Sequence, residues 1–183
     1  MMELKKFDVK QWAKIKEIYV EAFPKRERKP FFTLKHSVKK GNARIMVAVE
    51  EEQLLGFVVL IPYRDMMMVD YLAVSSKIRS KGTGSFIMQN VCRRFENKKI
   101  VLLIECLDDS AENKEQRVAR RKFYLKNGFV SSNIFIEGAS GEMEILNYGG
   151  TVSTEEYLAL QEYALGKLFF KLSKIRLIKK TTV

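Results

Sequence analysis

Histidine and cysteine are scarce in this chain of 183 residues, and their scarcity excludes several kinds of active site. His36 is the only histidine in the sequence, so a histidine-based metal centre or catalytic triad cannot be assembled. The two cysteines, Cys92 and Cys106, lie within apolar patterns and lack the spacing of a C-x-x-C motif or of metal ligands. We therefore expect two buried, reduced thiols and no metal ion.

Long apolar runs are also missing. The longest run, Leu54 to Ile61, is far shorter than the roughly 20 residues that a membrane-spanning helix needs. The N-terminal residues Met1 to Lys6 carry charge where a signal peptide has its apolar core. The sequence therefore predicts no transmembrane segment and a cytoplasmic location.

The composition is that of an ordinary globular protein. Apolar residues make up 46% and charged residues 30% of a chain that is long enough to bury one substantial core. Much of the net charge of +11 lies between residues 25 and 40 and in the tail after Glu162, the last acidic residue. A solvated basic surface, an acidic partner, and contact with nucleic acid or a membrane all fit this charge. Because no recognised DNA- or RNA-binding motif is present, we expect no nucleic-acid partner.

Apolar periodicity and turn residues predict the order of the elements. They predict an edge strand at residues 2–7, a helix at 9–23, a broken helix or loop at 24–42, strands at 43–50, 54–62 and 66–74, a helix at 84–96, a strand at 100–106, a helix at 113–127, and strands at 129–137 and 142–148. Further along the chain, Ser153 or Thr154 can cap another helix. Residues 168–178 fit either a second packed helix or a helix that lies on a membrane surface.

The stretch from Leu72 to Ser85 combines a strand end, a basic turn and a helix start. Gly82 and Gly84 let backbone N–H groups approach an anion without a Cβ in the way. The helix start adds unpaired N–H donors and the positive end of the helix dipole. Since Arg79 and Lys81 supply full positive charges, we expect this turn to bind phosphate.

Two other nucleotide-binding motifs do not fit this turn. A dinucleotide fingerprint needs a third glycine where Ile87 stands. A Walker loop needs Lys and then Ser or Thr after its second glycine, but Gly84 is followed by Ser85 and Phe86.

The run from Val74 to Gly84 has a basic residue five positions after the valine and then x-x-G-x-G, and it resembles the coenzyme A loop of the GNAT superfamily of N-acetyltransferases. A second segment, Phe123 to Phe129, resembles the FYxxxGF signature of the same superfamily. The sequence departs from the family pattern at two positions. Arg117 stands where many members have asparagine, and Ser76 stands where the loop often has proline.

The resemblance implies an α/β (α+β) fold with a single GNAT-like domain. Its sheet would be mixed and mostly antiparallel, with about six to seven strands, a central splayed parallel pair and flanking helices. Residues 1–150 would form the acetyl-CoA-binding N-acetyltransferase domain, and residues 151–183 a basic helical extension packed on it. The residues implied to contact acetyl-CoA or coenzyme A, the co-substrate, are Leu72, Ala73, Val74, Arg79, Ser80, Lys81, Gly82, Thr83, Gly84, Ser85 and Arg117.

The resemblance also implies catalytic roles. Tyr124 matches the family tyrosine that points at the coenzyme sulfur, so it is the candidate general acid for the departing thiolate, although it could simply pack the helix against the sheet. Glu105, at a strand end, is the candidate general base, acting directly or through a water, and Asp70 is the second candidate. Either carboxylate could instead recognise a cationic substrate. A main-chain N–H of Val74 or a neighbour would stabilise the thioester oxygen.

We therefore expect an enzyme that transfers an acetyl group from acetyl-CoA to a primary amine of a small molecule or peptide by direct attack in a ternary complex. One alternative is a non-catalytic acyl-CoA-binding module that engages a partner through its basic surfaces. Another is a basic nucleic-acid-binding protein. The sequence leaves the acceptor amine and the oligomeric state open, and it is compatible with a homodimer.

Overall fold

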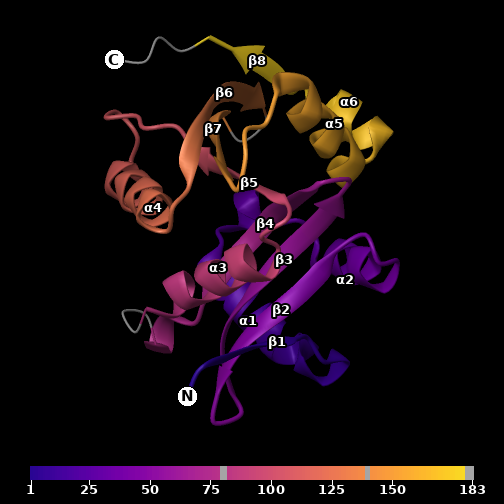
Figure 1. Ribbon diagram of the computed structural model, residues 1–183, viewed down its shortest axis with the longest axis vertical. Helices are drawn as coiled ribbons and strands as arrows, with labels where there is room; N and C mark the ends of the chain where they lie inside the picture. Colours follow the sequence, from indigo (N-terminus) through magenta and orange to yellow (C-terminus); the bar gives the residue numbers. More distant parts are fainter. Residues whose placement is uncertain (79–81, 139–140, 180–183) are drawn as a thin grey trace. The chain divides into compact units, whose positions relative to one another are not determined.

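The computed structural model describes residues 1–78, 82–138 and 141–179, and eight strands within them form one sheet (Figure 1). The strands are β1 (Glu3–Lys6), β2 (Arg44–Glu50), β3 (Gln53–Tyr63), β4 (Met66–Val74), β5 (Lys99–Glu105), β6 (Val130–Gly138), β7 (Gly141–Tyr148) and β8 (Arg176–Ile178). Hydrogen bonds connect them in the order β1-β2-β3-β4-β5-β7-β6-β8. The helices are α1 (Trp12–Ala22), α2 (Phe31–Lys39), α3 (Thr83–Arg94), α4 (Lys114–Lys126), α5 (Thr154–Leu165) and α6 (Lys167–Leu172), with short 3-10 turns η1 (Val9–Gln11), η2 (Lys25–Glu27) and η3 (Ser76–Ile78).

The chain forms two compact units. Unit 1 comprises Met1–Pro62 and Val69–Phe95, and unit 2 comprises Tyr63–Met68 and Glu96–Val183. Strand β4 therefore begins in unit 2 and ends in unit 1.

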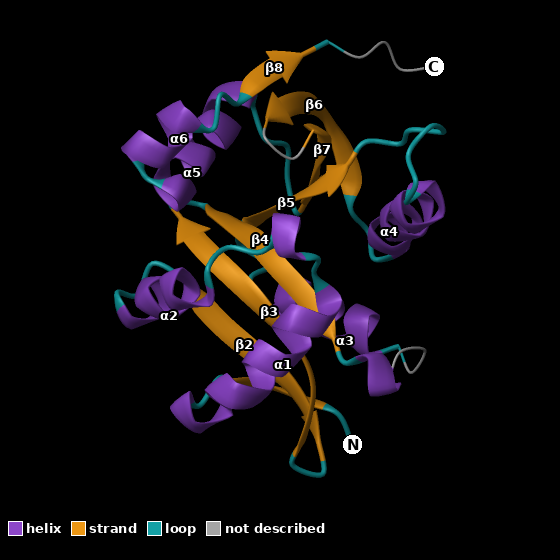
Figure 2. Cartoon of the chain, turned by 180° about the vertical axis from the view of Figure 1, so that it is seen from behind, coloured by secondary structure: helices purple, strands orange, loops and turns teal. Residues whose placement is uncertain are grey.

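Unit 1 contains the antiparallel strands β1, β2 and β3, with Leu4 opposite Ala48 and Val47 opposite Phe57. Residues 45–49 and 54–61 are all buried, without the alternation of a sheet that has one face in water. Helices on both faces explain this burial, because α3 covers one face of these strands and α1 and α2 cover the other (Figures 1 and 2). The near-continuous apolar character of β2 and β3 is thus a consequence of their position between two helical layers.

Gly56 lies in β3 against the end of β4. A Cβ at this position would lie 2.5 Å from the carbonyl oxygen of Ala73 and 3.2 Å from the Cα of Val74. Next to it, the N–H of Ser75 donates a hydrogen bond of 2.9 Å to the carbonyl of Leu55. Glycine at position 56 therefore lets the last residues of β4 pack directly against β3.

Unit 2 contains the parallel pair of the sheet. Met66–Met68 of β4 runs parallel to Lys99–Val101 of β5, and β4 and β5 then continue to Val74 and Glu105. On its other side β5 pairs antiparallel with β7 along its length. Strand β6 pairs with β7 on one side and with β8 on the other.

Helix α5 begins where the sequence predicts a cap. The hydroxyl of Ser153 accepts a hydrogen bond from the N–H of Glu156, and the Glu156 carboxylate accepts one from the N–H of Ser153. This reciprocal pair is a capping box, which fixes the helix start. The Glu156 carboxylate also pairs with Lys99 of β5 at 2.6 Å, so the cap connects α5 to the sheet.

The fold class predicted from the sequence is confirmed, with a mostly antiparallel sheet and a parallel β4–β5 pair. The described residues contain eight strands instead of six or seven, because Arg176–Ile178 pairs with the edge of β6. The expected helix at 168–178 accordingly ends at Leu172. The splay of the parallel pair and the division into residues 1–150 and 151–183 stay predictions. Of the helices in the described residues, none is long and apolar enough to cross a membrane.

Substituting Gly56 with alanine should destabilise the protein by about 2–3 kcal/mol, because the new methyl group would overlap the rigid backbone of β4. The measurement is the free energy of unfolding in urea. Gly138→Ala is the matched control, since its Cβ would meet the flexible side chain of Ile175 at 3.3 Å and the carbonyl oxygen of Ser173 only at 3.8 Å, an ordinary contact distance. Equal losses in the two variants would contradict the close approach of β4 to Gly56.

Candidate active site

The end of β4 alternates in burial. Tyr71 and Ala73 are buried, whereas Asp70, Leu72 and Val74 are partly exposed. Successive side chains of a strand point to opposite faces, so the three partly exposed residues share one face. The structure thus places Leu72 and Val74 on the face of β4 that also carries the second candidate base, Asp70.

The N-terminus of α3 follows the predicted phosphate-binding turn, of which Arg79, Ser80 and Lys81 lie outside the described residues. Gly82 is the N-cap, with φ +75° and ψ 6°, a left-handed conformation that glycine adopts without strain. No side chain caps this helix within the described residues, and its first turn contains no acidic residue. Backbone N–H groups at such a helix start are available to an anion.

Thr83 differs from the rest of this helix start. Its side chain is buried, and its hydroxyl donates to the sulfur of Met2 at 3.7 Å. Gly84 and Ser85 follow it in the first turn of α3. The hydroxyl of Thr83 therefore has a structural contact, and a role in coenzyme binding would come from its backbone.

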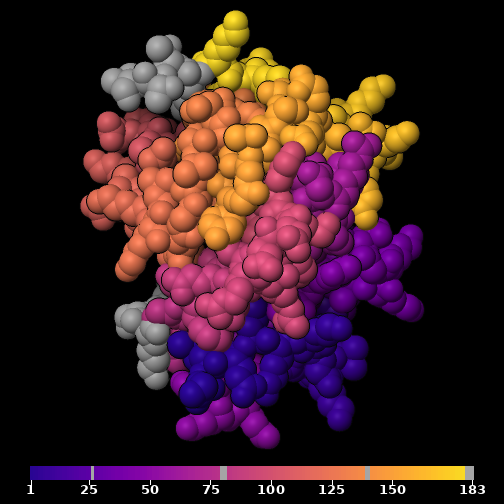
Figure 3. All heavy atoms as spheres, viewed as in Figure 1, coloured from indigo at the N-terminus to yellow at the C-terminus, as the bar shows by residue number. Residues whose placement is uncertain are grey.

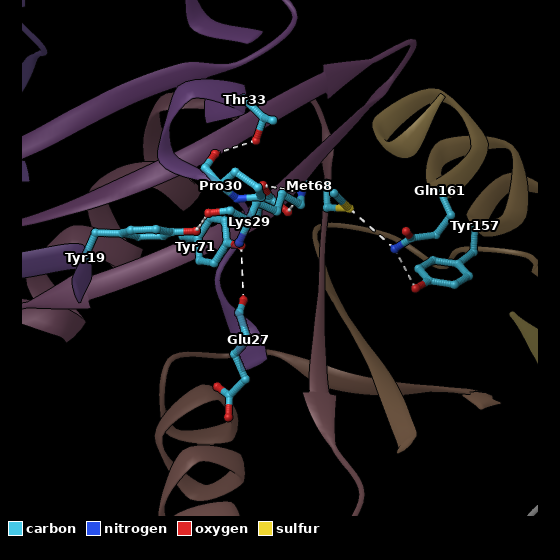
Figure 4. A network of polar contacts seen from close by, with 10 residues as sticks. Tyr19, Glu27, Lys29, Pro30, Thr33, Met68, Tyr71, Tyr157 and Gln161 are labelled. Carbon is cyan, nitrogen blue, oxygen red and sulfur yellow. Dashed lines mark hydrogen bonds and ion pairs between the residues drawn. The ribbon is translucent and has the colours of Figure 1, made fainter. Parts of the chain in front are cut away.

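The loop between α1 and α2 is held by two tyrosines, Tyr71 of β4 and Tyr19 of α1 (Figure 4). The Tyr71 hydroxyl donates to the carbonyl of Glu27 at 3.2 Å and accepts from the N–H of Lys29 at 3.1 Å. The Tyr19 hydroxyl donates to the carbonyl of Lys29 at 3.1 Å. Burial raises the pKa of both hydroxyls, and the Asp70 carboxylate raises the pKa of Tyr71 further. Both hydroxyls therefore stay protonated and act as hydrogen-bond donors.

Asp70 is paired with a cation from the same loop. The Nζ atom of Lys29 lies 2.8 Å from each carboxylate oxygen of Asp70. It also lies 5.7 Å from the ring centroid of Tyr71. The candidate base on β4 is therefore neutralised by a lysine, a partner that the sequence did not reveal.

Glu105, at the end of β5, is held by three side chains from α4 and its N-cap. Its carboxylate accepts hydrogen bonds from Nδ2 of Asn113, at 3.1 and 3.3 Å, and from Arg120. Arg117 forms an ion pair with it at 3.4 Å. The same Arg117 donates to the carbonyl of Cys106 at 2.9 Å and to Oδ1 of Asn113 at 2.8 Å.

These contacts determine how basic Glu105 is. Burial alone would raise the pKa of its carboxyl group, but the hydrogen bond from Asn113 and the charges of Arg120 and Arg117 outweigh burial and lower the pKa. Glu105 is thus ionised at neutral pH, and donors surround its oxygens. The cluster of Glu105, Arg117 and Arg120 has one negative and two positive charges, so its net charge is +1.

Tyr124 is the only buried side chain of α4. Its ring makes edge contacts with Phe123 and Phe129, at centroid distances of 5.0 and 5.7 Å. Burial raises the pKa of Tyr124 to about 12, against a small lowering by Arg120. Within the described residues the structure records no hydrogen bond to its hydroxyl.

The sequence singled out Glu105, Asp70 and Tyr124 as candidates but did not reveal the side chains that contact them. Asn113, Arg120 and Lys29 were not singled out as partners of the two candidate bases. The helical spacing of Asn113, Arg117, Arg120 and Tyr124, three or four residues apart, places them along one face of α4 and could have indicated a shared cluster. No comparable local pattern links Lys29 to Asp70. The catalytic and cofactor-binding roles of all these residues stay predictions.

Substituting Glu105 with glutamine should make the free energy of unfolding depend less on pH in the acidic range. Folding lowers the pKa of Glu105 below its ordinary value of 4.5. The ionised carboxylate therefore stabilises the folded protein fully at pH values above 4.5, and this stabilisation is lost as the pH falls through the lower pKa of the folded state. At pH 7 the free energy of unfolding of the variant should be lower by about 1–3 kcal/mol, since two arginines lose their anionic partner. The measurement is the free energy of unfolding at pH 7 and pH 3.

The difference in free energy of unfolding between wild type and Glu105→Gln should be smaller at pH 3 than at pH 7. Glu112→Gln, at an exposed position before α4, is the control and should show little difference at either pH. A difference for Glu105→Gln that is the same at both pH values would mean that folding does not lower the pKa of this group.

The family of the chain is decided by comparison with known proteins. A model of the acetyltransferase (GNAT) domain matches residues 41–131, a range that contains the end of β4, the start of α3, Glu105 and Tyr124. The comparison with curated protein sequences gave no significant match.

Solved structures with a similar fold include a protein assigned to the GNAT family of acetyltransferases from Bacteroides thetaiotaomicron, with a TM-score of 0.73 and 17% identity over 92% of this chain and 98% of that one. An acetyltransferase from Bacillus subtilis, solved in complex with CoA, has a TM-score of 0.63 and 13% identity over 80% and 97% of the two chains. The ribosomal-protein-S18-alanine N-acetyltransferase of Escherichia coli has a TM-score of 0.64 and 14% identity over 85% and 97%. At these identities the structural likeness concerns the fold, and the domain match identifies this chain as a member of the GNAT family of acetyltransferases.

Proposed function

We propose that this protein is an acetyl-CoA-dependent N-acetyltransferase that acetylates a primary amine of a small molecule or peptide. The observation that carries the proposal is the acetyltransferase domain match, which includes both the β4–α3 segment and the β5–α4 segment. The CoA complex of the Bacillus subtilis protein with a similar fold supports coenzyme A as the co-substrate.

The start of α3 fits the phosphates of coenzyme A. Gly82 is in the left-handed conformation, the helix lacks a side-chain cap within the described residues, and no acidic side chain stands in its first turn. We assign phosphate binding to the backbone N–H groups of Gly82, Thr83, Gly84 and Ser85. Arg79, Ser80 and Lys81 belong to the same proposed site on the basis of the sequence.

Leu72, Ala73 and Val74 are proposed to bind the pantetheine arm through their backbone. These residues form the last part of β4, beyond its recorded pairing with β5 at Met66–Met68. A strand with free backbone groups on one side can pair with an extended ligand as with another strand. Arg117 would have to exchange existing contacts to bind coenzyme A, because its guanidinium group already contacts Glu105, Cys106 and Asn113.

Acetyl-CoA supplies an acetyl group activated as a thioester. Direct attack by the acceptor nitrogen forms the new N–C bond while the C–S bond breaks, so the departing sulfur needs a proton and the nitrogen must lose one. We assign the first proton to the Tyr124 hydroxyl. Burial raises the pKa of Tyr124 to about 12, so the hydroxyl carries its proton throughout the neutral range but is a weaker acid than an exposed tyrosine.

The amine proton must also be removed, but both candidate bases already have cationic partners. Glu105, the proposed base, has a lowered pKa and donors on both oxygens, and Asp70 is paired with Lys29. The net positive charge of the Glu105 cluster also repels an ammonium group. We therefore propose that the acceptor reacts as the neutral amine, with Glu105 receiving the proton through a water or serving to orient Arg117 and Arg120.

A non-catalytic acyl-CoA-binding module is the second candidate function. The observation that favours it is that both candidate bases, Glu105 and Asp70, are occupied by cations. Such a module would bind acetyl-CoA without releasing free coenzyme in the presence of any amine. The two functions differ in turnover, not in affinity for the coenzyme.

Substituting Gly82 with valine should weaken CoA binding by about tenfold or more, because a β-branched residue resists the left-handed backbone that presents the N–H groups. Gly41→Val is a matched control. Gly41 and Gly82 have φ of +78° and +75°, and among the described residues a Cβ at either would meet no atom within 4 Å. Both variants should lose similar stability, about 1–2 kcal/mol, but only Gly82→Val should lose affinity in calorimetric titration with CoA.

Two results would contradict the proposed coenzyme site. One is the absence of any CoA binding by the folded wild-type protein. The other is an equal loss of affinity in Gly82→Val and Gly41→Val, since backbone strain alone would then explain the effect.

Substituting Tyr124 with phenylalanine should lower kcat by about 100-fold, because the sulfur loses its proton donor. Stability should change by less than about 0.5 kcal/mol, since within the described residues the hydroxyl has no recorded hydrogen bond. The assay measures thiol released from acetyl-CoA with a panel of amines. Tyr163→Phe, which removes the hydroxyl of an exposed tyrosine on α5, should leave kcat unchanged.

An unchanged kcat in Tyr124→Phe would exclude Tyr124 as the general acid and leave its ring a packing role. If the wild type binds CoA tightly but releases no thiol with any amine, the non-catalytic module is the better assignment.

A further inference from the structure

The segment Lys167–Lys179, which contains α6 and β8, has two sets of apolar side chains. Phe170, Ile175 and Ile178 are partly buried. Ile178 lies opposite Phe135 in the pairing of β8 with β6, and Ile175 lies close to Gly138. This first set therefore attaches the segment to unit 2.

The second apolar set faces outward. Leu168, Phe169 and Leu172 are 68%, 67% and 65% exposed, and Leu177 is also exposed. In a helix, positions i, i+1 and i+4 lie within an arc of about 100°, so the three residues of α6 form one ridge. Figure 3 shows the atoms of this part of the chain in yellow. Three large apolar side chains this exposed on one helical turn indicate an interaction surface.

Lysines lie beside this ridge in α6 and follow it in the chain. Lys167, Lys171, Lys174 and Lys179 are exposed and form no recorded ion pair within the described residues. Arg176 is the exception, because it pairs with Glu137 at 2.6 Å. No acidic residue follows Glu162 in the sequence, so nothing within the segment neutralises these lysines.

An exposed apolar ridge flanked by lysines matches the chemistry of an anionic lipid surface. The apolar side chains can enter the boundary between headgroups and acyl chains, while the lysines stay at the level of the charged headgroups. A nucleic acid would satisfy the lysines but would leave Leu168 and Leu172 against phosphate and sugar. The charge and the aliphatic residues together therefore favour lipid over nucleic acid.

We propose that α6 and its flanking lysines bind peripherally to membranes that contain anionic phospholipid. Leu168, Phe169 and Leu172 insert, and Lys167, Lys171 and Lys174 contact the headgroups. A single apolar anchor or a single basic patch gives only weak membrane binding, whereas the two signals combined give more stable attachment. None of these residues is among those assigned to acetyl transfer, and the proposal does not depend on the proposed function.

The test is cosedimentation of the full chain with vesicles of phosphatidylcholine alone or with about one-third phosphatidylglycerol. The wild type should bind the anionic vesicles and not the neutral ones, and 0.5 M salt should reduce binding because it screens the lysines. Phe169→Ser should weaken binding about tenfold, through loss of an inserted apolar side chain. Lys171→Gln combined with Lys174→Gln should weaken it by about fivefold per lysine.

Matched controls come from α2. Phe32 is 72% exposed, and Lys39 and Lys40 are exposed at the end of that helix. Phe32→Ser and the Lys39→Gln, Lys40→Gln pair remove the same chemical groups elsewhere on the surface. They should leave vesicle binding within about twofold of the wild type, and circular dichroism establishes that every variant is folded.

Three outcomes would overturn the proposal. The first is no binding of the wild type to anionic vesicles at low salt. The second is equal losses in the α6 variants and the α2 controls, which would mean that net charge acts without a defined surface. The third is binding to an RNA homopolymer or an acidic protein that Phe169→Ser weakens, without binding to vesicles, which would assign the ridge to another partner.

Discussion

The attachment of α4 to the neighbouring strands depends on ion pairs between two carboxylates and three arginines. Glu105 contacts Arg117 and Arg120, and the buried Glu144 of β7 contacts Arg121 at 2.9 Å. Most surface helices are held by an apolar stripe, but Tyr124 is the only buried side chain of α4. Directional polar contacts therefore set the position of the helix that carries the proposed general acid. Partly buried ion pairs add little net stability, because desolvation offsets their attraction, but they discriminate strongly between alternative placements.

The same ion pairs limit the chemistry that unit 2 can perform. A carboxylate that positions two guanidinium groups is poorly suited to accept a proton, because the charges that hold it also lower its basicity. Unit 1 shows a parallel case, in which Lys29 neutralises Asp70 and two tyrosines fix the surrounding loop. Both candidate bases are thus already paired with cations, whereas the buried Tyr124 hydroxyl keeps its proton at neutral pH.

A buried polar contact also lies within α5, where the Gln161 amide donates a hydrogen bond of 2.7 Å to the Tyr157 hydroxyl (Figure 4).

The sequence predicted those features, such as strand bounds and helix caps, that are determined by residues close together in the chain. The bounds of β4, Met66–Val74, match the prediction, because an apolar run between polar turns leaves little choice of strand ends. The cap of α5 by Ser153 was also predictable, since the capping chemistry lies within four residues. The existence of β8 was not, because Arg176–Ile178 becomes a strand only through the edge of β6, which lies about 40 residues away in the chain. For the same reason the sequence could name Glu105 and Asp70 as candidate bases but could not predict the cations that the fold places beside them.

Strand β8 has a consequence for how the molecule behaves at high concentration. It is three residues long, it covers β6 from Phe135 to Glu137, and basic residues precede and follow its apolar positions. A short, charged last strand is a poor template for further strands, so the sheet stops growing there. Without these residues the outer edge of β6, with Phe135 and Ile136, would be open to hydrogen bonding with other molecules. We therefore expect a chain trimmed before Ser173 to self-associate through the uncovered edge of β6.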